Sequence, residues 1–137
     1  MAVAAQGRFA AIVDGPHDSA LGYAKIDAII GRHVRRALGD APEMVLGDSR
    51  IRNAVQLLAL LEAHFPKAKI DIAPNVVSMT GTPDWLAREA ARFFYTTFVL
   101  DASQRVELLE ELAVLFAAQG DNKVFIMPIN RVVVSQP

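Results

Sequence analysis

The chain has 137 residues, enough for one domain with a hydrophobic core. Its 14 basic and 15 acidic residues nearly cancel, which excludes a general electrostatic attraction to nucleic acid or to an anionic membrane surface. The chain has no cysteine, and this excludes disulfide bonds, thiolate metal sites and cysteine nucleophiles.

The first forty residues contain one clear strand and one ambiguous segment. Residues 8–14 (RFAAIVD) form a short apolar run before the turn sequence DGPHDS, so we predict a strand there. In residues 19–38 the sequence KIDAII suits a strand, although five residues recur at helical spacing: Ala20, Tyr23, Ile26, Ile30 and Val34. The pattern leaves helix and strand both open. The break GDAP at residues 39–42 is the predicted end of an N-terminal extension, residues 1–42.

Residues 43–137 are predicted to form one domain, on which the extension packs to give a single globular unit. We predict strands over residues 43–48, 69–77, 92–100 and 123–134, with one helix that Ser49 caps and one over residues 103–119. The later helix is expected to turn Val106, Leu109, Ala113 and Phe116 inward.

A polar connection with a short helical pattern lies over residues 80–91. Thr82 is its expected N-cap and Pro83 its expected first helical residue.

An internal repeat supports this order of elements. The pattern K-x-x-I-x-P of residues 69–74 recurs in residues 123–128, and the preceding helices align at the same offset. Each copy is strand, helix, strand, and two such units make an α+β fold, the ferredoxin-like βαββαβ sandwich. The alternative is an α/β fold with an open parallel sheet, for which the connection over residues 80–91 is short.

Two short patterns resemble one known family. Residues 120–128 read G-D-x-K-V-F-I-x-P, carried by Gly120, Asp121, Lys123, Val124, Phe125, Ile126 and Pro128. A second pattern, P-x-V-x-S, is carried by Pro74, Val76 and Ser78. The first resembles the last turn and strand of PII-like signalling proteins, and the second is similar to a strand of their CutA-type relatives. The resemblance spans residues 43–137.

The resemblance implies a nucleotide sensor, because PII proteins are trimers that bind ATP or ADP between subunits and dock onto targets through a loop. The implied ligand turn consists of Gly120, Asp121, Asn122 and Lys123. The implied partner loop spans residues 80–92 and includes Thr80, Thr82, Arg88 and Arg92. In such a turn, glycine lets backbone amides approach an anion and lysine adds positive charge.

Three other polar groups have a functional and a structural interpretation. Asp14, His17 and Asp18 follow the first strand and could hold a metal or perform acid–base chemistry, although a turn with a helix cap is favoured. Gly47-Asp48-Ser49 resembles the start of an esterase nucleophile sequence. A serine nucleophile needs a histidine base that an acid orients, and the candidate base His64 has no evident acid, so capping by Ser49 is favoured. Arg32, His33, Arg35 and Arg36 form a basic run, best interpreted as a solvated helix face.

The leading hypothesis is a non-enzymatic, PII-like regulatory protein that binds a small anionic ligand of the adenine nucleotide class (ATP, ADP or AMP). The first alternative is a structural or assembly module without a ligand, and the second is a small metal-dependent enzyme that uses Asp14, His17 and Asp18. Hydrophobic residues make up 53% of the chain, which predicts a homo-oligomer, and the resemblance favours a trimer. Residues 1–7 lack a secretion signal and no apolar run has membrane-spanning length, so we expect a cytoplasmic protein without membrane insertion or a nucleic-acid partner.

Overall fold

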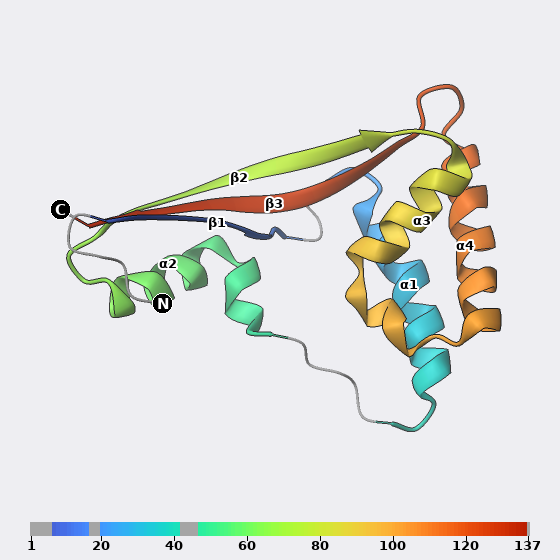
Figure 1. Ribbon diagram of the computed structural model, residues 1–137, viewed down its shortest axis with the longest axis horizontal. Helices are drawn as coiled ribbons and strands as arrows, with labels where there is room; N and C mark the ends of the chain where they lie inside the picture. The colour runs from blue at the N-terminus through green and yellow to red at the C-terminus, as the bar shows by residue number, and fades with distance from the viewer. Residues whose placement is uncertain (1–6, 17–19, 42–46, 137) are drawn as a thin grey trace. The chain divides into compact units, whose positions relative to one another are not determined.

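The chain forms an α+β fold with a three-stranded antiparallel sheet (Figure 1). The computed structural model describes residues 7–16, 20–41 and 47–136. Its elements are β1 (Arg8–Asp14), α1 (Tyr23–Leu38), the 3₁₀ helix η1 (Ser49–Arg52), α2 (Ala54–His64), β2 (Lys69–Thr80), α3 (Pro83–Phe93), the 3₁₀ helix η2 (Tyr95–Val99), α4 (Ala102–Ala117) and β3 (Val124–Ser135). The strand order is β1-β3-β2, so β3 is central. The α+β class predicted from the sequence is thus confirmed.

The chain divides into two compact units. The first, which we call the sheet unit, comprises Met1–Ser19, Gly47–Val77 and Met127–Pro137. The second, the helical unit, comprises Ala20–Leu46 and Ser78–Ile126. This division does not follow the expected boundary at residue 42, because the segment before that residue contributes to both units.

In the sheet unit, β1 and β3 pair with Arg8 opposite Ser135 and Asp14 opposite Ile129. The chain leaves β1 through Gly15, whose N–H donates to the carbonyl of Pro128. A Cβ atom on Gly15 would lie 2.9 Å from backbone atoms of β3, so only glycine permits this approach. Among the described residues, the hydrophobic cluster between α2 and the sheet has three buried members, Leu57 of α2 and Val132 and Val134 of β3.

The helical unit has a larger core, formed by α1, α3, α4 and the start of β3. The five residues of the predicted helical stripe are all buried: Ala20, which precedes α1, and Tyr23, Ile26, Ile30 and Val34 within it. Leu86 and Ala90 of α3 are fully buried, as are Leu112 and Phe116 of α4. The ring of Phe116 packs edge-on against that of Phe125, with ring centroids 6.2 Å apart. Residues 23–38 are therefore a helix, which decides between the two assignments that the sequence leaves open.

The predicted strand over residues 92–100 is wrong. Thr82 accepts a hydrogen bond from the Trp85 N–H and Pro83 begins α3, as predicted, but the helix continues to Phe93 and is followed by η2. The rings of Phe93 and Phe94 pack against Tyr23, with centroids 6.2 and 5.2 Å away. Tertiary contacts of these aromatic residues thus replace the extended backbone that their local propensity favours.

One further local prediction needs correction, in α4, which Asp101 caps through a capping box with Gln104. Val106 is 55% exposed, whereas Leu108 is buried, so the buried face of α4 is rotated from the predicted one.

At the start of α2, the cap predicted for Ser49 is wrong. Asn53 accepts hydrogen bonds from the Val55 and Gln56 N–H groups and so caps α2. Asp48 caps the short η1 helix, and a hydrogen bond from Arg50 lowers the pKa of Asp48 to about 2.

The internal repeat has a structural counterpart in its second half. The helix–strand pairs α2–β2 and α4–β3 occupy equivalent positions of the two copies, and both strands belong to the same sheet. The predicted first strand of the first copy falls largely on residues 43–46, which lie outside the described residues. That of the second copy is replaced by the end of α3 and by η2.

Candidate functional site

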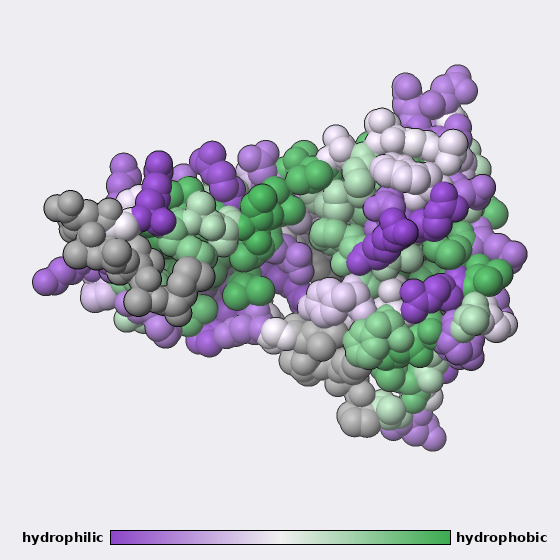
Figure 2. All heavy atoms as spheres, in the orientation of Figure 1, coloured by the Kyte–Doolittle hydropathy of each residue, from purple (hydrophilic) through white to green (hydrophobic). Residues whose placement is uncertain are grey.

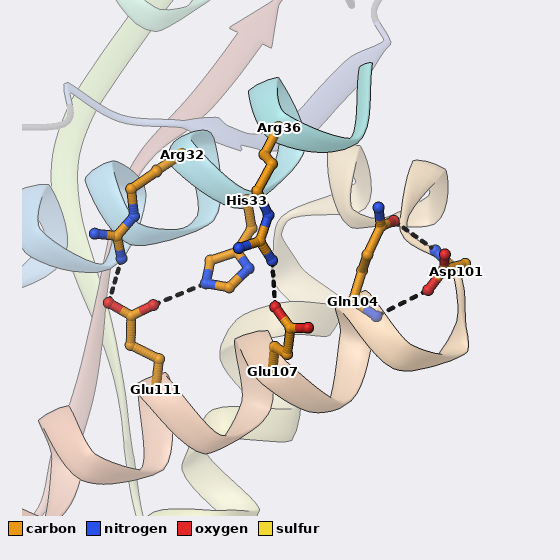
Figure 3. Close-up of polar contacts among 7 residues, drawn as sticks. All are labelled: Arg32, His33, Arg36, Asp101, Gln104, Glu107 and Glu111. Atoms are coloured by element: carbon orange, nitrogen blue, oxygen red, sulfur yellow. Dashed lines mark hydrogen bonds and ion pairs between the residues drawn. The ribbon is translucent and has the colours of Figure 1, made fainter. Parts of the chain in front are cut away.

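Within the helical unit, α1 and α4 form an open cleft of about 330 Å³ lined by charged side chains. The lining residues are Arg32, His33, Arg36, Glu107 and Glu111. Arg32 and Arg36 are one helical turn apart on α1, and Glu107 and Glu111 are one turn apart on α4. Arg32 pairs with Glu111 and Arg36 pairs with Glu107, so two ion pairs cross the cleft in parallel (Figure 3).

His33 lies at the base of this cleft and contacts the same carboxylate as Arg32 (Figure 3). Its Nε2 is 2.7 Å from a carboxylate oxygen of Glu111, and its side chain is only 6% exposed. Because a carboxylate accepts hydrogen bonds, Nε2 carries the proton in this contact. The other ring nitrogen, Nδ1, is buried and has no hydrogen-bond partner.

The electrostatics of the cleft stabilise ionised Glu111. The hydrogen bond from His33 lowers the pKa of Glu111, and Arg32 lowers it further, while partial burial of the carboxylate opposes the shift. The two arginines and the two glutamates neutralise one another. These ion pairs therefore connect α1 to α4. Both arginines of the cleft are paired with carboxylates, and neither nitrogen of His33 is accessible for proton transfer.

The structure adds partners to the basic run. Arg32, Arg35 and Arg36 are all exposed, as expected of a solvated helix face, while Arg32 and Arg36 also pair with carboxylates of α4 and His33 is buried against Glu111. Sequence reasoning did not identify Glu107 and Glu111 as partners. The available signal was the matched spacing, since both basic and acidic pairs are four residues apart.

The predicted ligand turn lies between α4 and β3 and is exposed at Gly120, Asp121 and Asn122. Gly120 has a left-handed backbone conformation, with φ of 80°. The ammonium group of Lys123 donates a hydrogen bond to the Gly120 carbonyl, and the Gln119 side chain bonds both backbone groups of Val124. The turn is thus closed by its own side chains.

The predicted partner loop is a helix. Thr80 ends β2, Thr82 caps α3, and Arg88 and Arg92 lie on the exposed face of that helix. Arg92 forms an ion pair with Glu89 one turn earlier. The opposite face of α3 packs against α4, so this segment is part of the core of the helical unit.

The predicted cluster after β1 is described only in part, because His17 and Asp18 lie outside the described residues. Asp14 forms an ion pair with Arg52, with 3.8 Å between Oδ2 and Nε. His64 contacts the carbonyl of Leu60 within its own helix. Among the residues that the structure describes, no three histidine or acidic side chains come together in a way that could hold a metal ion.

The chain matches no protein-family model, and comparison with curated proteins finds no relative. Within the described ranges, no helix combines the length and the apolar character needed to cross a bilayer.

Proposed function

We propose that this protein is a non-enzymatic binding protein that works by assembling with other copies of itself. The observation that carries this proposal is the small core of the sheet unit. Among the described residues, the cluster between α2 and the sheet buries Leu57, Val132 and Val134, and nine neighbouring hydrophobic residues remain partly exposed. A sheet gains independent stability by burying a hydrophobic face, and this unit buries little of it.

Hydrophobic side chains also reach the surface of both units on the face drawn in Figure 2. In the helical unit, Phe98 is 63% exposed and Val114 is 71% exposed. In the sheet unit, Ile12 and Val55 are among the exposed residues. Such surface accords with the high hydrophobic content of the chain and favours association.

The cleft supports a non-enzymatic role. His33 is the histidine of the cleft, and its pairing with Glu111 uses one ring nitrogen while the other is buried. A general base must reach the proton that it removes, and this arrangement keeps both nitrogens from a substrate.

Sedimentation velocity over a wide range of protein concentration tests the proposal. We expect a concentration-dependent increase in mass from monomer to a closed oligomer. A monomer at every concentration would overturn self-assembly.

A second candidate is the PII-like sensor, in which an adenine nucleotide binds at the turn and controls a trimer with a ferredoxin-like subunit. It is favoured by one observation: Gly120 has the left-handed conformation that lets backbone amides approach an anion, and Lys123 is adjacent. Binding would require Lys123 to leave the Gly120 carbonyl.

Thermal unfolding with ATP, ADP and AMP tests the sensor hypothesis. Saturation at a hundredfold excess over Kd should stabilise the protein by about 2.7 kcal/mol, and Lys123→Ala should abolish the effect. Lys67→Ala, a change of another exposed turn lysine, is the matched control. A flat response of the wild type to all three nucleotides would overturn the sensor and leave self-assembly standing.

A further inference from the structure

β2 is an outer strand of the sheet, and among the described residues no strand pairs with its outer edge. At its start, Ile70 and Ile72 are only partly buried, although both pack against the core of the sheet unit. Lys69 and Asp71 alternate with them and are exposed. This edge therefore combines unpaired backbone groups with an incompletely covered core.

Pro74 indicates which backbone groups face outward. A proline has no N–H, and within a sheet it lies in an edge strand with its nitrogen directed away from the neighbouring strand. Backbone groups alternate between the two edges along a strand, so the N–H and C=O groups of Ile70 and Ile72 also face outward. The preceding residue, Ala68, already donates its N–H to Phe65, so the free stretch is bounded by Ala68 and Pro74.

We propose that this stretch of β2 pairs antiparallel with the same stretch of a second copy, with Ile70 opposite the second copy's Ile70. The inference rests on the proposed self-assembly and names its surface. Charge complementarity selects the register, because this pairing sets Lys69 opposite the second copy's Asp71, and the two-fold symmetry repeats that contact.

The neighbouring registers are less favourable. Pairing centred on Lys69 sets two lysines opposite each other, and pairing centred on Asp71 sets two aspartates opposite each other. Pairing centred on Ile72 brings Pro74 into the ladder, where it has no N–H to donate.

The selected register also suits the geometry of the charged pair. With the groups of Ile70 facing the partner, Lys69 and Asp71 occupy non-hydrogen-bonded positions, in which facing side chains lie closer together. Asp71 already pairs with Arg131 at 3.2 Å within its own chain, so the dimer places each Asp71 between two cations. The partly exposed isoleucines of the two copies meet at the two-fold axis and extend the core.

Charge substitution tests the pairing. In a dimer of Lys69→Asp, aspartates face aspartates, and in a dimer of Asp71→Lys, lysines face lysines. Each variant alone should dimerise about tenfold or more weakly than the wild type. An equimolar mixture should restore dimerisation as a heterodimer, because the two carboxylates of a Lys69→Asp chain then face the two ammonium groups of an Asp71→Lys chain. Sedimentation and native mass spectrometry measure both effects.

Lys67→Asp is the matched control, since it makes the same charge change at an exposed position before the strand. We expect it to dimerise like the wild type. If Lys69→Asp associates as the wild type does, or if the mixture yields no heterodimer, edge pairing is wrong while self-assembly stands. A wild type that stays monomeric overturns both proposals.

Discussion

The helical unit and the sheet unit of one chain differ in how much of their hydrophobic surface they bury. Among the described residues, fourteen hydrophobic residues of the helical unit are buried, against four in the sheet unit, Leu57, Met127, Val132 and Val134. The helical unit thus has an interior of its own. In the described part of the sheet unit, α2 packs on the sheet, and partly exposed residues surround a small buried centre.

The difference in buried hydrophobic surface indicates which of the two units is suited to bind a partner. A unit with a complete core needs no partner to be stable, whereas a unit with a small core gains stability from any surface that covers it. The free edge of β2 lies beside the small core. We therefore assign stability chiefly to the helical unit and assembly chiefly to the sheet unit.

The largest expected effect comes from matched truncation of the two cores. Leu112→Ala in the helical unit should lower the free energy of unfolding by about 2–5 kcal/mol, because Leu112 is fully buried. Leu57→Ala in the sheet unit should cost about 2 kcal/mol or less, because its half-exposed neighbours allow water to reach the vacated space. Urea unfolding at one low protein concentration measures both. Equal losses would contradict the difference between the units.

Helix caps sharpen the comparison, because a cap is a local interaction that core size does not affect. Asp101→Ala in α4 and Asn53→Ala in α2 should each lower the free energy of unfolding by about 1 kcal/mol. Ser103→Ala is the control, since the structure gives the cap to Asp101, and it should change stability by less than about 0.5 kcal/mol. A larger effect at Ser103 than at Asp101 would show that the cap is assigned to the wrong residue.

The smallest expected effect concerns the cleft of the helical unit. Because the pKa of Glu111 is lowered in the folded state, ionised Glu111 contributes stability above its unfolded-state pKa. That contribution is lost as the pH falls through the folded-state pKa. Glu111→Gln should therefore destabilise the protein at neutral pH, by less than about 1 kcal/mol because the carboxylate is 39% exposed and screened.

Urea unfolding as a function of pH measures this effect. The stability difference between Glu111→Gln and the wild type should vanish in strong acid, where both side chains are neutral. Glu110→Gln, on the exposed face of the same helix, is the matched control. A difference for Glu111→Gln that persists unchanged below the folded-state pKa would show that the effect is not electrostatic.

The sequence pattern predicts elements well where the local signal and the packing agree. The stripe over residues 20–34 is buried at all five positions that recur at helical spacing, although the sequence KIDAII also suits a strand. Thr82 and Pro83 start α3 as their chemistry indicates. The last helix and the last strand form within a few residues of their predicted bounds.

The predictions that fail depend on contacts between distant residues. The aromatic and β-branched residues 92–100 have strand propensity, but Phe93 and Phe94 are held by Tyr23 about seventy positions earlier in the chain. The buried face of α4 is set by its packing on α3, and Val106 therefore lies outside it. The sequence indicates only the basic residues of the cleft, because their glutamate partners lie on another helix, far along the chain.

Hydrogen exchange of backbone amides at several protein concentrations tests the central claim most directly. If the sheet unit completes its core by pairing β2 with a second copy, the amides of Ile70 and Ile72 should exchange more slowly as the concentration rises. The amides of Leu112 and Phe116 in the helical unit should keep the same rates. Rates for Ile70 and Ile72 that do not depend on concentration across a range in which the protein associates would contradict the account.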